Sequence, residues 1–310
     1  LGGPSNFLRV GLETALHSIL VAVEEACTQA GVTLRDITAL GIGLGGVDHP
    51  THHRRMRDAL YAELAARSGG PAVSAASPRW SAENVLLTTD AEIALAGATD
   101  CQPGIVIISG TGSIAYGMNN RGQRARSGGW GPTFGDEGSG YDIARRALRA
   151  VVSSYDGRLQ PTLLTERICR HFGIESPADL PPIIYGSEKI NIASLTELVI
   201  ETARDGDAVA RQILWDAAEE LARAVIAVIR RLRMQQDEFL VCYVGSVFLA
   251  KELILEPLRE RIRAVAPRAT LAPPLFPPTV GAIKLALRRL HLVPESGNIH
   301  QSLTPVLKTS

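Results

Sequence analysis

One glycine-rich stretch, SGTGSIAYGMNNRGQRARSGGWGPTFGDEG at residues 109–138, indicates the fold of this chain. An apolar run at residues 105–108 precedes it and predicts a buried strand, and residues 114–118 predict a second strand. Gly110 and Gly112 therefore lie at the tip of a strand–turn–strand unit. Glycines there allow backbone N–H groups to close on an anion, and the neighbouring hydroxyls add donors. An empty tight turn would tolerate the same glycines, so both interpretations stay open for this turn alone.

Length and composition narrow the class of protein. The 310 residues allow two domains or one large one, and basic and acidic residues balance at 32 each. The balanced charge and sparse aromatic residues argue against a nucleic-acid surface, and the apolar segments are too short to cross a membrane. No signal peptide is visible, and the four cysteines are widely separated without metal-ligand spacing. We therefore expect a cytoplasmic protein with reduced thiols, and no membrane or nucleic-acid partner.

Predicted strands and helices alternate along the chain, which indicates an α/β protein. Predicted strands cover residues 37–44, 85–88, 105–108, 114–118 and 239–244, and predicted helices cover residues 10–30, 52–67, 91–98, 139–153, 207–233, 253–265 and 279–290. The stretch from about 150 to 233 is predicted to be mostly helical. The residues from about 293 onward are expected to form an unpacked tail.

A carboxylate stands at one predicted strand–helix junction. Asp90 follows the predicted strand at residues 85–88 and precedes a helix, where aspartate is commonly an N-cap. It could instead act as a general base, because ligands bind at the carboxyl edge of a parallel sheet. A base there would accept the proton of a substrate hydroxyl as its oxygen attacks phosphorus. The local sequence alone leaves both roles open.

The end of the glycine-rich stretch suits a sugar. Trp130 would offer an apolar surface to a sugar ring, the backbone amides of Gly129 and Gly131 would donate, and Asp136 would accept from hydroxyl groups. Trp130 could also be a core residue, and Asp136 or its neighbour a first-turn acid of the following helix. Further along, the pair at residues 245–246 is either a tight strand–helix turn or a point of close approach to a nucleotide.

These motifs together resemble the N-acetylglucosamine kinases of the BadF/BadG/BcrA/BcrD group, within the sugar kinase, Hsp70 and actin superfamily. The resemblance covers nearly all of residues 2–290, and its GGWGxxxGDEGS string is highly specific. It rests on Gly2-Gly3-Pro4-Ser5-Asn6, Gly43-Leu44-Gly45-Gly46-Val47-Asp48, Thr88-Thr89-Asp90-Ala91, Ser109 to Ser113, Gly128 to Gly138 and Val244-Gly245-Ser246-Val247.

The resemblance implies roles for particular residues. Asp90 matches the catalytic base. Sugar contacts match Asn6, Ser113, Gly129, Trp130 and Asp136, and nucleotide contacts match Gly110, Thr111, Gly112, Gly245 and Ser246, with Ala193 on a looser alignment. The implied cofactors are ATP and Mg²⁺, and no protein ligand of the metal is identified. The oligomeric state is left open, with a homodimer among the alternatives.

The resemblance also implies a two-domain actin-like ATPase fold of the ribonuclease H-like type, which closes an interdomain cleft over sugar and ATP. The expected amino-terminal subdomain spans residues 1–101 and is completed by the helix at 279–292. The expected carboxy-terminal subdomain spans residues 102–278, with a helical insertion at about 150–233, and a tail follows at 293–310.

One departure from the family pattern concerns the start of the chain. Family members carry a glycine-rich hairpin of the form DGGGTKT before the segment that corresponds to residues 2–6, where it clamps phosphate. No such motif occurs here, and the chain starts with Leu1. We therefore expect a chain that lacks its first strands, with an amino-terminal sheet of about two or three strands.

Three functions are consistent with these residues. The first is ATP-dependent phosphorylation of an amino sugar, N-acetylglucosamine or glucosamine, at its 6-hydroxyl. The second is an ATPase that activates a dehydratase through a shared iron–sulfur cluster, which needs paired cysteines in glycine-rich loops that this sequence does not show. The third is a non-catalytic sugar sensor derived from a kinase, and the missing hairpin favours it.

Overall fold

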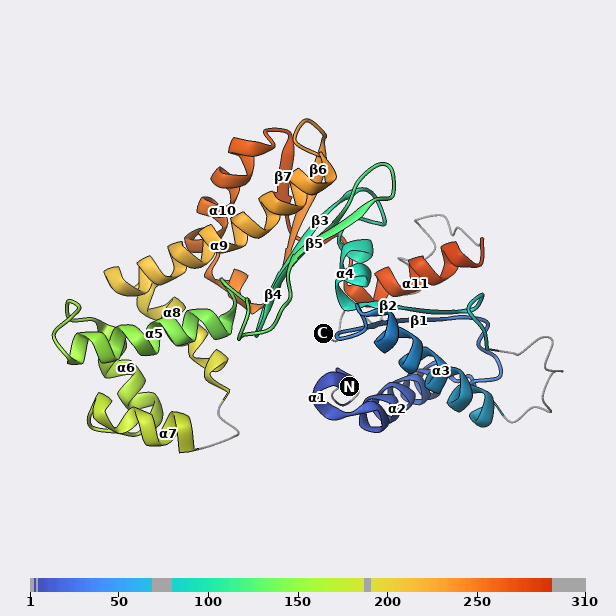
Figure 1. Ribbon diagram of the computed structural model, residues 1–310, viewed down its shortest axis with the longest axis horizontal. Helices are drawn as coiled ribbons and strands as arrows, with labels where there is room; N and C mark the ends of the chain where they lie inside the picture. The colour runs from blue at the N-terminus through green and yellow to red at the C-terminus, as the bar shows by residue number, and fades with distance from the viewer. Residues whose placement is uncertain (1–2, 4, 69–79, 187–190, 292–310) are drawn as a thin grey trace. The chain divides into compact units, whose positions relative to one another are not determined.

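The computed structural model describes Gly3 and residues 5–68, 80–186 and 191–291 (Figure 1). The chain divides into two compact units. Unit 1 contains Leu1–Cys101 and the chain from Leu275 onward, and unit 2 contains Gln102–Pro274. The predicted tail at 293–310 lies outside the described residues, as does part of the segment at residues 2–6.

Unit 1 is built around two parallel strands, β1 (Leu40–Leu44) and β2 (Val85–Thr89), with Leu40 opposite Val85 and Leu44 opposite Thr89. Its helices are α1 (Phe7–Val10), α2 (Leu12–Ala30), α3 (Pro50–Arg67), α4 (Asp90–Ala98) and α11 (Pro278–Arg289). The described part of unit 1 thus has a two-stranded sheet, within the range of two or three that the sequence predicts.

The carboxy-terminal helix α11 belongs to unit 1 although it is far from it in sequence. The chain returns to unit 1 at Leu275, whose N–H donates to the Ala98 carbonyl at 3.1 Å. Nine residues further along, within α11, Lys284 pairs with Asp100 near the end of the amino-terminal segment. Contacts of α11 with α4, β1 and β2 then complete the helical cover of the sheet (Figure 1).

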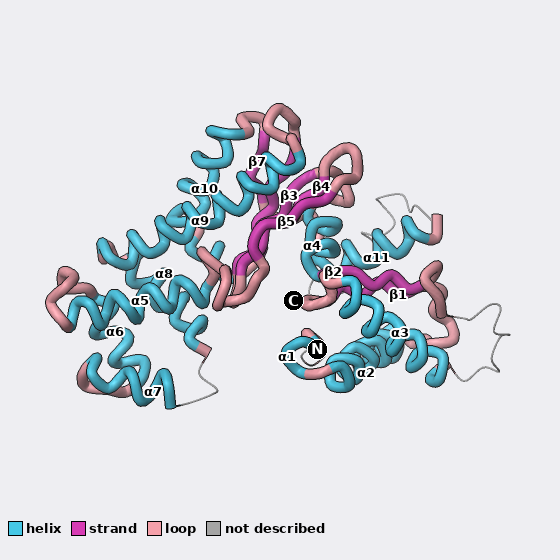
Figure 2. Tube along the Cα trace, in the orientation of Figure 1, coloured by secondary structure: helices cyan, strands magenta, loops and turns pink. Residues whose placement is uncertain are grey.

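Unit 2 contains a mixed sheet (Figure 2), which has five strands in the order β5-β4-β3-β6-β7. The strands are β3 (Gly104–Ser109), β4 (Ser113–Met118), β5 (Arg124–Gly128), β6 (Phe239–Val244) and β7 (Ala269–Ala272). The β3-β4-β5 portion is an antiparallel meander, whereas β3, β6 and β7 run parallel. The turn at residues 110–112 is therefore the tip of the β3–β4 hairpin, as the sequence predicts.

Helices cover this sheet and extend beyond its end. The long helix α9 (Ala208–Leu232) packs on β3, β4 and β5, and α10 (Glu252–Val265) packs beside it (Figure 1). The other helices of unit 2 are α5 (Gly140–Tyr155), α6 (Leu163–Phe172), η1 (Pro177–Asp179), α7 (Leu180–Gly186), η2 (Ile192–Ser194), α8 (Leu195–Arg204) and η3 (Ser246–Ala250). The predicted helix at 207–233 is confirmed, since Asp207 caps the start of α9 and Arg233 its end.

Within the described residues, no helix combines the length and the apolar character needed to cross a membrane.

A close backbone contact fixes the β6–η3 turn against the end of β3. Gly245 has φ +120°, and a Cβ at this position would lie 2.1 Å from the Ser109 carbonyl oxygen and 3.1 Å from the Gly110 nitrogen. No real side chain tolerates such an approach to backbone atoms. Glycine at this position therefore allows the turn after β6 to lie directly against the start of the turn at residues 110–112, which follows β3.

Gly245→Ala should destabilise unit 2 by on the order of 2 kcal/mol or more, because it combines a backbone clash with an unfavourable φ. Gly186→Ala is the matched control, since a Cβ there meets nothing within 4 Å. Chemical denaturation followed by circular dichroism measures both. Equal midpoints for Gly245→Ala and the wild type would show that the two backbones are free to separate.

Candidate functional site

Asp90 lies at the carboxyl edge of the parallel sheet of unit 1. It is the first residue of α4, directly after β2, and β1 ends at Leu44, opposite Thr89, with Gly45 following it. A Cβ on Gly45 would lie 3.3 Å from Asp90 Oδ2, so the loop after β1 passes next to the carboxylate. The helix cap is a different residue, Thr89, whose hydroxyl accepts from Glu92 N–H at 3.1 Å. The N-cap interpretation of Asp90 is therefore wrong, and its carboxylate is not needed to cap α4.

Asn6 lies at the same edge. Its Oδ1 accepts from Leu8 N–H at 3.2 Å, which leaves the Nδ2 amine to face the loop after β1. A Cβ on Gly45 would lie 3.3 Å from this Nδ2 as well as from Asp90 Oδ2. Unit 1 therefore brings together two predicted residues, a hydrogen-bond donor and a carboxylate, around one glycine.

The surroundings of Asp90 disfavour its charged form. Partial desolvation raises the pKa of Asp90, a hydrogen bond from Ala91 N–H opposes this, and the negative charge of Asp48 raises the pKa further. Asp90 is exposed to solvent, although the loop after β1 lies close to its carboxylate. A carboxylate that takes up a proton more readily than usual suits a general base.

The turn at the tip of the β3–β4 hairpin is held by the start of α5. Gly140 N–H donates to the Gly110 carbonyl at 2.7 Å, and Tyr141 N–H donates to the Thr111 carbonyl at 3.4 Å. In a planar trans peptide the N–H points opposite to the C=O. The amides of Thr111 and Gly112 must therefore point away from α5, as a pair of donors for an anion.

The loop that follows β5 carries the predicted sugar contacts Gly129 and Trp130. Trp130 is 64% exposed, so its interpretation as a core residue is wrong, and Arg126 lies over its ring at 4.7 Å from the centroid. The Gly129 N–H donates to the Ser113 carbonyl at 2.9 Å. The expectation that this amide donates to a sugar is therefore not supported, because the end of the β4–β5 pairing uses it.

Asp136 is the buried member of the same loop. Its side chain accepts from Ser113 N–H at 3.3 Å, and a Cβ on Gly112 would lie 3.0 Å from Asp136 Oδ2. Its φ of +63° is in the left-handed region, which residues other than glycine occupy mainly where surrounding contacts impose it. Since α5 begins at Gly140 with Ser139 as its cap, Asp136 precedes the helix and is not one of its first-turn acids.

Ser113 connects this loop to the hairpin. This buried residue makes two hydrogen bonds to the loop. Its hydroxyl donates to the Glu137 carbonyl at 2.8 Å, and its N–H donates to the Asp136 carboxylate. The hydroxyl can therefore only accept a hydrogen bond from a ligand. Four of the predicted residues, Gly112, Ser113, Asp136 and Gly110, are thus part of one connected backbone arrangement in unit 2.

The predicted nucleoside contacts lie around the same turn. Gly245 contacts the Ser109–Gly110 backbone, and the exposed Ser246 begins η3 directly after it. Ala193 lies in η2, which packs against α5. Thr196, three residues further on, donates to the Gly140 carbonyl at 2.9 Å, so the start of α8, which follows η2, is bonded to the first residue of α5.

Side chains that could hold a metal ion or a metal cluster are those of His, Cys, Asp and Glu. Across the described residues, no group of three or more His, Cys, Asp or Glu side chains could hold a metal ion. All four cysteines, Cys27, Cys101, Cys169 and Cys242, are free and buried. Buried thiols in separate places do not favour a cluster shared between subunits.

Two residues near the site were not assigned a role by the sequence reasoning. The charge of Asp48 raises the pKa of Asp90, although in the sequence its segment stands out only as part of the family resemblance. Asp142 accepts from Gly138 N–H at 3.1 Å and so contacts the loop that follows β5. Its signal is the pattern Ser139-x-x-Asp142 at a helix start, which is typical of an N-terminal capping arrangement.

Comparison with known proteins finds relatives along most of the chain. A Clostridium acetobutylicum protein named N-acetylmuramic acid/N-acetylglucosamine kinase is 35% identical over 286 residues, which are 92% of this chain and 88% of the relative. A Dictyostelium discoideum protein named N-acetyl-D-glucosamine kinase is 30% identical, over 91% of this chain and 88% of the relative. Both alignments extend across both units.

Solved structures share the fold. A crystal structure from Chromobacterium violaceum, provisionally assigned as an N-acetylglucosamine kinase, superposes with a TM-score of 0.67 at 28% identity, covering 92% of this chain and 88% of that one. A Streptomyces griseus ROK family glucokinase in complex with glucose and AMPPNP superposes at 0.52 and 19% identity, covering 89% and 88%. The latter likeness shows the fold alone, which is the actin-like ATPase fold of sugar kinases.

The family model for the BadF/BadG/BcrA/BcrD ATPase family matches residues 1–286, which include every residue of the site described above. This chain belongs to the BadF/BadG/BcrA/BcrD ATPase family.

Proposed function

We propose that this protein is an ATP-dependent kinase that transfers the γ-phosphoryl group to the 6-hydroxyl of an amino sugar of the N-acetylglucosamine type. The observation that carries the proposal is the confined carboxylate of Asp90 beside Asn6 at the carboxyl edge of a parallel sheet. The names of the relatives support the substrate class, since they are kinases of N-acetylglucosamine and N-acetylmuramic acid. In this proposal the two units serve one reaction.

Asp90 is the general base of the proposed reaction. Its carboxylate would accept the proton of the sugar hydroxyl as that oxygen bonds to the γ-phosphorus and the bond to the bridging oxygen of ADP breaks. Asn6 Nδ2, on the same side of Gly45, would donate to the sugar and orient the hydroxyl. Positioning of this kind supplies most of the rate enhancement in phosphoryl transfer.

The nucleotide contacts come from the β3–β4 turn. The amides of Thr111 and Gly112 point away from α5 and would donate to phosphate oxygens, together with the Thr111 hydroxyl. Gly245 and Ser246 would border the nucleoside. Mg²⁺, when bound to ATP, neutralises phosphate charge, and it keeps several waters and needs only one or two carboxylates from a protein.

The sugar contacts come from the loop after β5. The exposed Trp130 would stack on the sugar ring, and Asp136 would accept from its hydroxyl groups. The left-handed conformation of Asp136 supports this role, because residues held in such conformations concentrate at functional sites. The alternative, a non-catalytic sugar sensor, would use the same loop but would not need Asp90.

Asp90→Asn should lower kcat by about 10²–10⁴ while the sugar Kd stays within about tenfold, because the amide keeps the shape but cannot take a proton. A coupled assay for ADP gives kcat, and calorimetry with N-acetylglucosamine gives Kd. Near-normal turnover in this variant would remove Asp90 from the mechanism. A wild-type protein that binds the sugar but shows no turnover would favour the sensor.

The pH dependence of kcat/KM should report the environment of Asp90. Only the deprotonated base is active, so activity falls as pH decreases through the pKa of Asp90, and desolvation and Asp48 place this acid limb above the ordinary value of 3.8. Asp48→Asn removes the like charge and should move the limb to lower pH. An acid limb that does not move in Asp48→Asn would mean that another group controls it.

Trp130→Ala should raise the KM for the sugar by up to about tenfold and leave the KM for ATP nearly unchanged, because packing on an aromatic face contributes about 0.5–1.5 kcal/mol. Phe134→Ala is the matched control, since Phe134 is an aromatic residue of the same loop and is 82% exposed. Steady-state kinetics with each substrate varied in turn measures both. An equal rise in the two variants would show a general loop effect rather than a sugar contact.

A further inference from the structure

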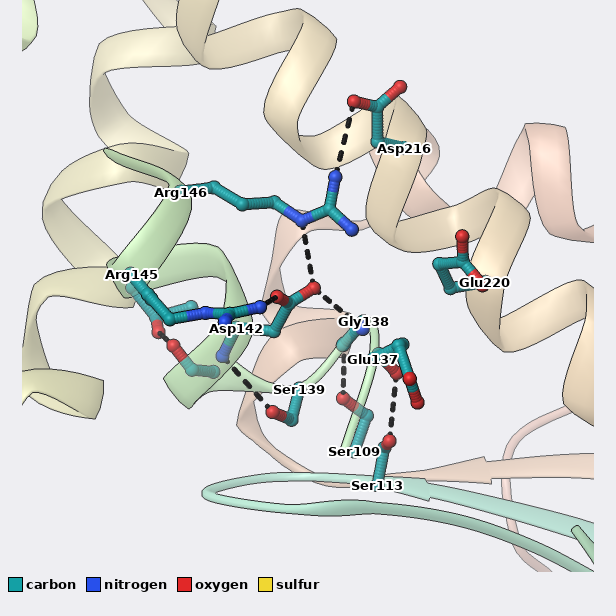
Figure 3. Close-up of polar contacts among 12 residues, drawn as sticks. Ser109, Ser113, Glu137, Gly138, Ser139, Asp142, Arg145, Arg146, Asp216 and Glu220 are labelled. Atoms are coloured by element: carbon teal, nitrogen blue, oxygen red, sulfur yellow. Dashed lines mark hydrogen bonds and ion pairs between the residues drawn. The ribbon is translucent and has the colours of Figure 1, made fainter. Parts of the chain in front are cut away.

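The peptide group between Glu137 and Gly138 is held at both of its polar edges. Its carbonyl accepts from the Ser113 hydroxyl of β4 at 2.8 Å, and its N–H donates to Asp142 Oδ2 of α5 at 3.1 Å (Figure 3). These two partners come from different elements on opposite sides of the loop. The plane of this peptide is therefore fixed by a strand on one side and a helix on the other.

The next peptide group is held in the same way. The Gly138 carbonyl accepts from the Ser109 hydroxyl of β3 at 2.9 Å, and Ser139 N–H donates to the Asp136 carbonyl at 3.1 Å. Gly138 itself has φ +74°, and a Cβ there would lie 2.6 Å from the Ala217 carbonyl of α9. The loop therefore passes tightly between α9 and the hairpin, and its backbone has little freedom just after Asp136.

The carboxylate of Asp142 is itself fixed. The residue is 2% exposed, and besides Gly138 N–H it accepts from Arg145 and from Arg146, each at 2.8 Å. Arg146 also reaches Asp216 of α9 at 3.4 Å (Figure 3). Burial alone would raise the pKa of Asp142, but the hydrogen bonds from Arg145, Gly138 and Arg146 outweigh it and hold this pKa below its usual value. The group therefore favours its charged form and has a defined orientation.

We infer that Asp142 is a positioning residue for the sugar site, which holds the 137–138 peptide so that Asp136 keeps its left-handed conformation against the Gly112–Ser113 backbone. Asp142 touches no predicted ligand contact directly, and it acts through the Gly138 N–H. This inference rests on the proposed function, because it assigns a task to Asp142 in binding the amino sugar through Asp136.

A purely structural role for Asp142 makes a different prediction. If the residue only caps α5, its loss should lower stability without a preference between ligands. The turn at residues 110–112 is held to α5 by the backbone of Gly140 and Tyr141, not by the Asp142 carboxylate. Loss of the carboxylate should therefore free the backbone at residues 137–138, while the turn at residues 110–112 keeps its hydrogen bonds to α5.

The test compares Asp142→Ala with Asp207→Ala in the full chain. Asp207 is a capping carboxylate in the same unit, whose Oδ1 accepts from Ala210 N–H at 2.8 Å at the start of α9. Calorimetry gives the Kd for N-acetylglucosamine and for a non-hydrolysable ATP analogue, and thermal melts give the stability of each variant. Amide hydrogen exchange of the segment at residues 136–139 reports the loop itself.

Asp142→Ala should weaken sugar binding about tenfold or more and speed amide exchange in the loop, with nucleotide binding within about threefold of wild type. Asp207→Ala should lower the melting temperature and leave the sugar Kd unchanged. The inference is overturned if Asp142→Ala binds the sugar as the wild type does, or if Asp207→Ala weakens the sugar equally.

Two further measurements keep the test decisive. If Asp142→Ala does not fold, Asp142→Asn retains an acceptor for Gly138 N–H but loses the charge that Arg145 and Arg146 hold, so a smaller loss of sugar affinity is expected. Unchanged sugar affinity and unchanged exchange in Asp142→Asn would then overturn the inference. A wild-type protein that binds no amino sugar would refute the proposed function instead, and the exchange measurement would still test the effect of Asp142 on the loop.

Discussion

The hydrogen bond from Gly140 N–H to the Gly110 carbonyl is the contact on which the arrangement of unit 2 depends. The first amides of a helix lack partners within the helix and commonly bind anions directly. Here the first amides of α5, those of Gly140 and Tyr141, donate instead to the carbonyls of the hairpin turn. The turn is thereby oriented with the N–H groups of Thr111 and Gly112 outward, and one peptide layer separates them from the positive end of the helix.

Unit 1 uses a simpler constraint, the parallel pairing of β1 and β2 in register. Because Leu44 lies opposite Thr89, the residues that follow the two strands emerge side by side. One strand is followed by glycines and the other by Asp90, so the carboxylate faces backbone rather than bulky side chains. The nearby charge of Asp48 then makes this edge unfavourable for a second anion and favourable for a proton.

The sequence predicted most elements because their boundaries carry strong local signals. Helix α9 spans Ala208–Leu232 with Asp207 and Arg233 as its caps, within one residue of the prediction at each end, and β6 has the predicted bounds. Strand β5, with the sequence RARSG, was missed because it is short and polar, and it exists because β4 supplies its hydrogen-bond partners. Strand β1 is shorter than predicted, since Ile37 packs against the core of unit 1 without joining the strand.

The residues of the candidate site can be recognised in the sequence, but their hydrogen bonds cannot. The glycines, Trp130 and Asp136 stand out by type and spacing. That Gly129 N–H serves β4 follows from the strand pairing, which the sequence does not reveal. Asp142 was missed because a carboxylate in the first turn of a helix is ordinary, and only its burial and its bond to Gly138 distinguish it.

The burial of all four cysteines has a practical consequence for studying the loop after β5. A thiolate is the reactive form of cysteine. Burial raises the pKa of Cys242 to about 11, and it also raises the pKa of Cys101 and of Cys169. The native thiols should therefore react slowly with maleimides at neutral pH. A cysteine placed at the exposed position of Phe134 would accept a fluorescent or spin label selectively, without removal of any native cysteine.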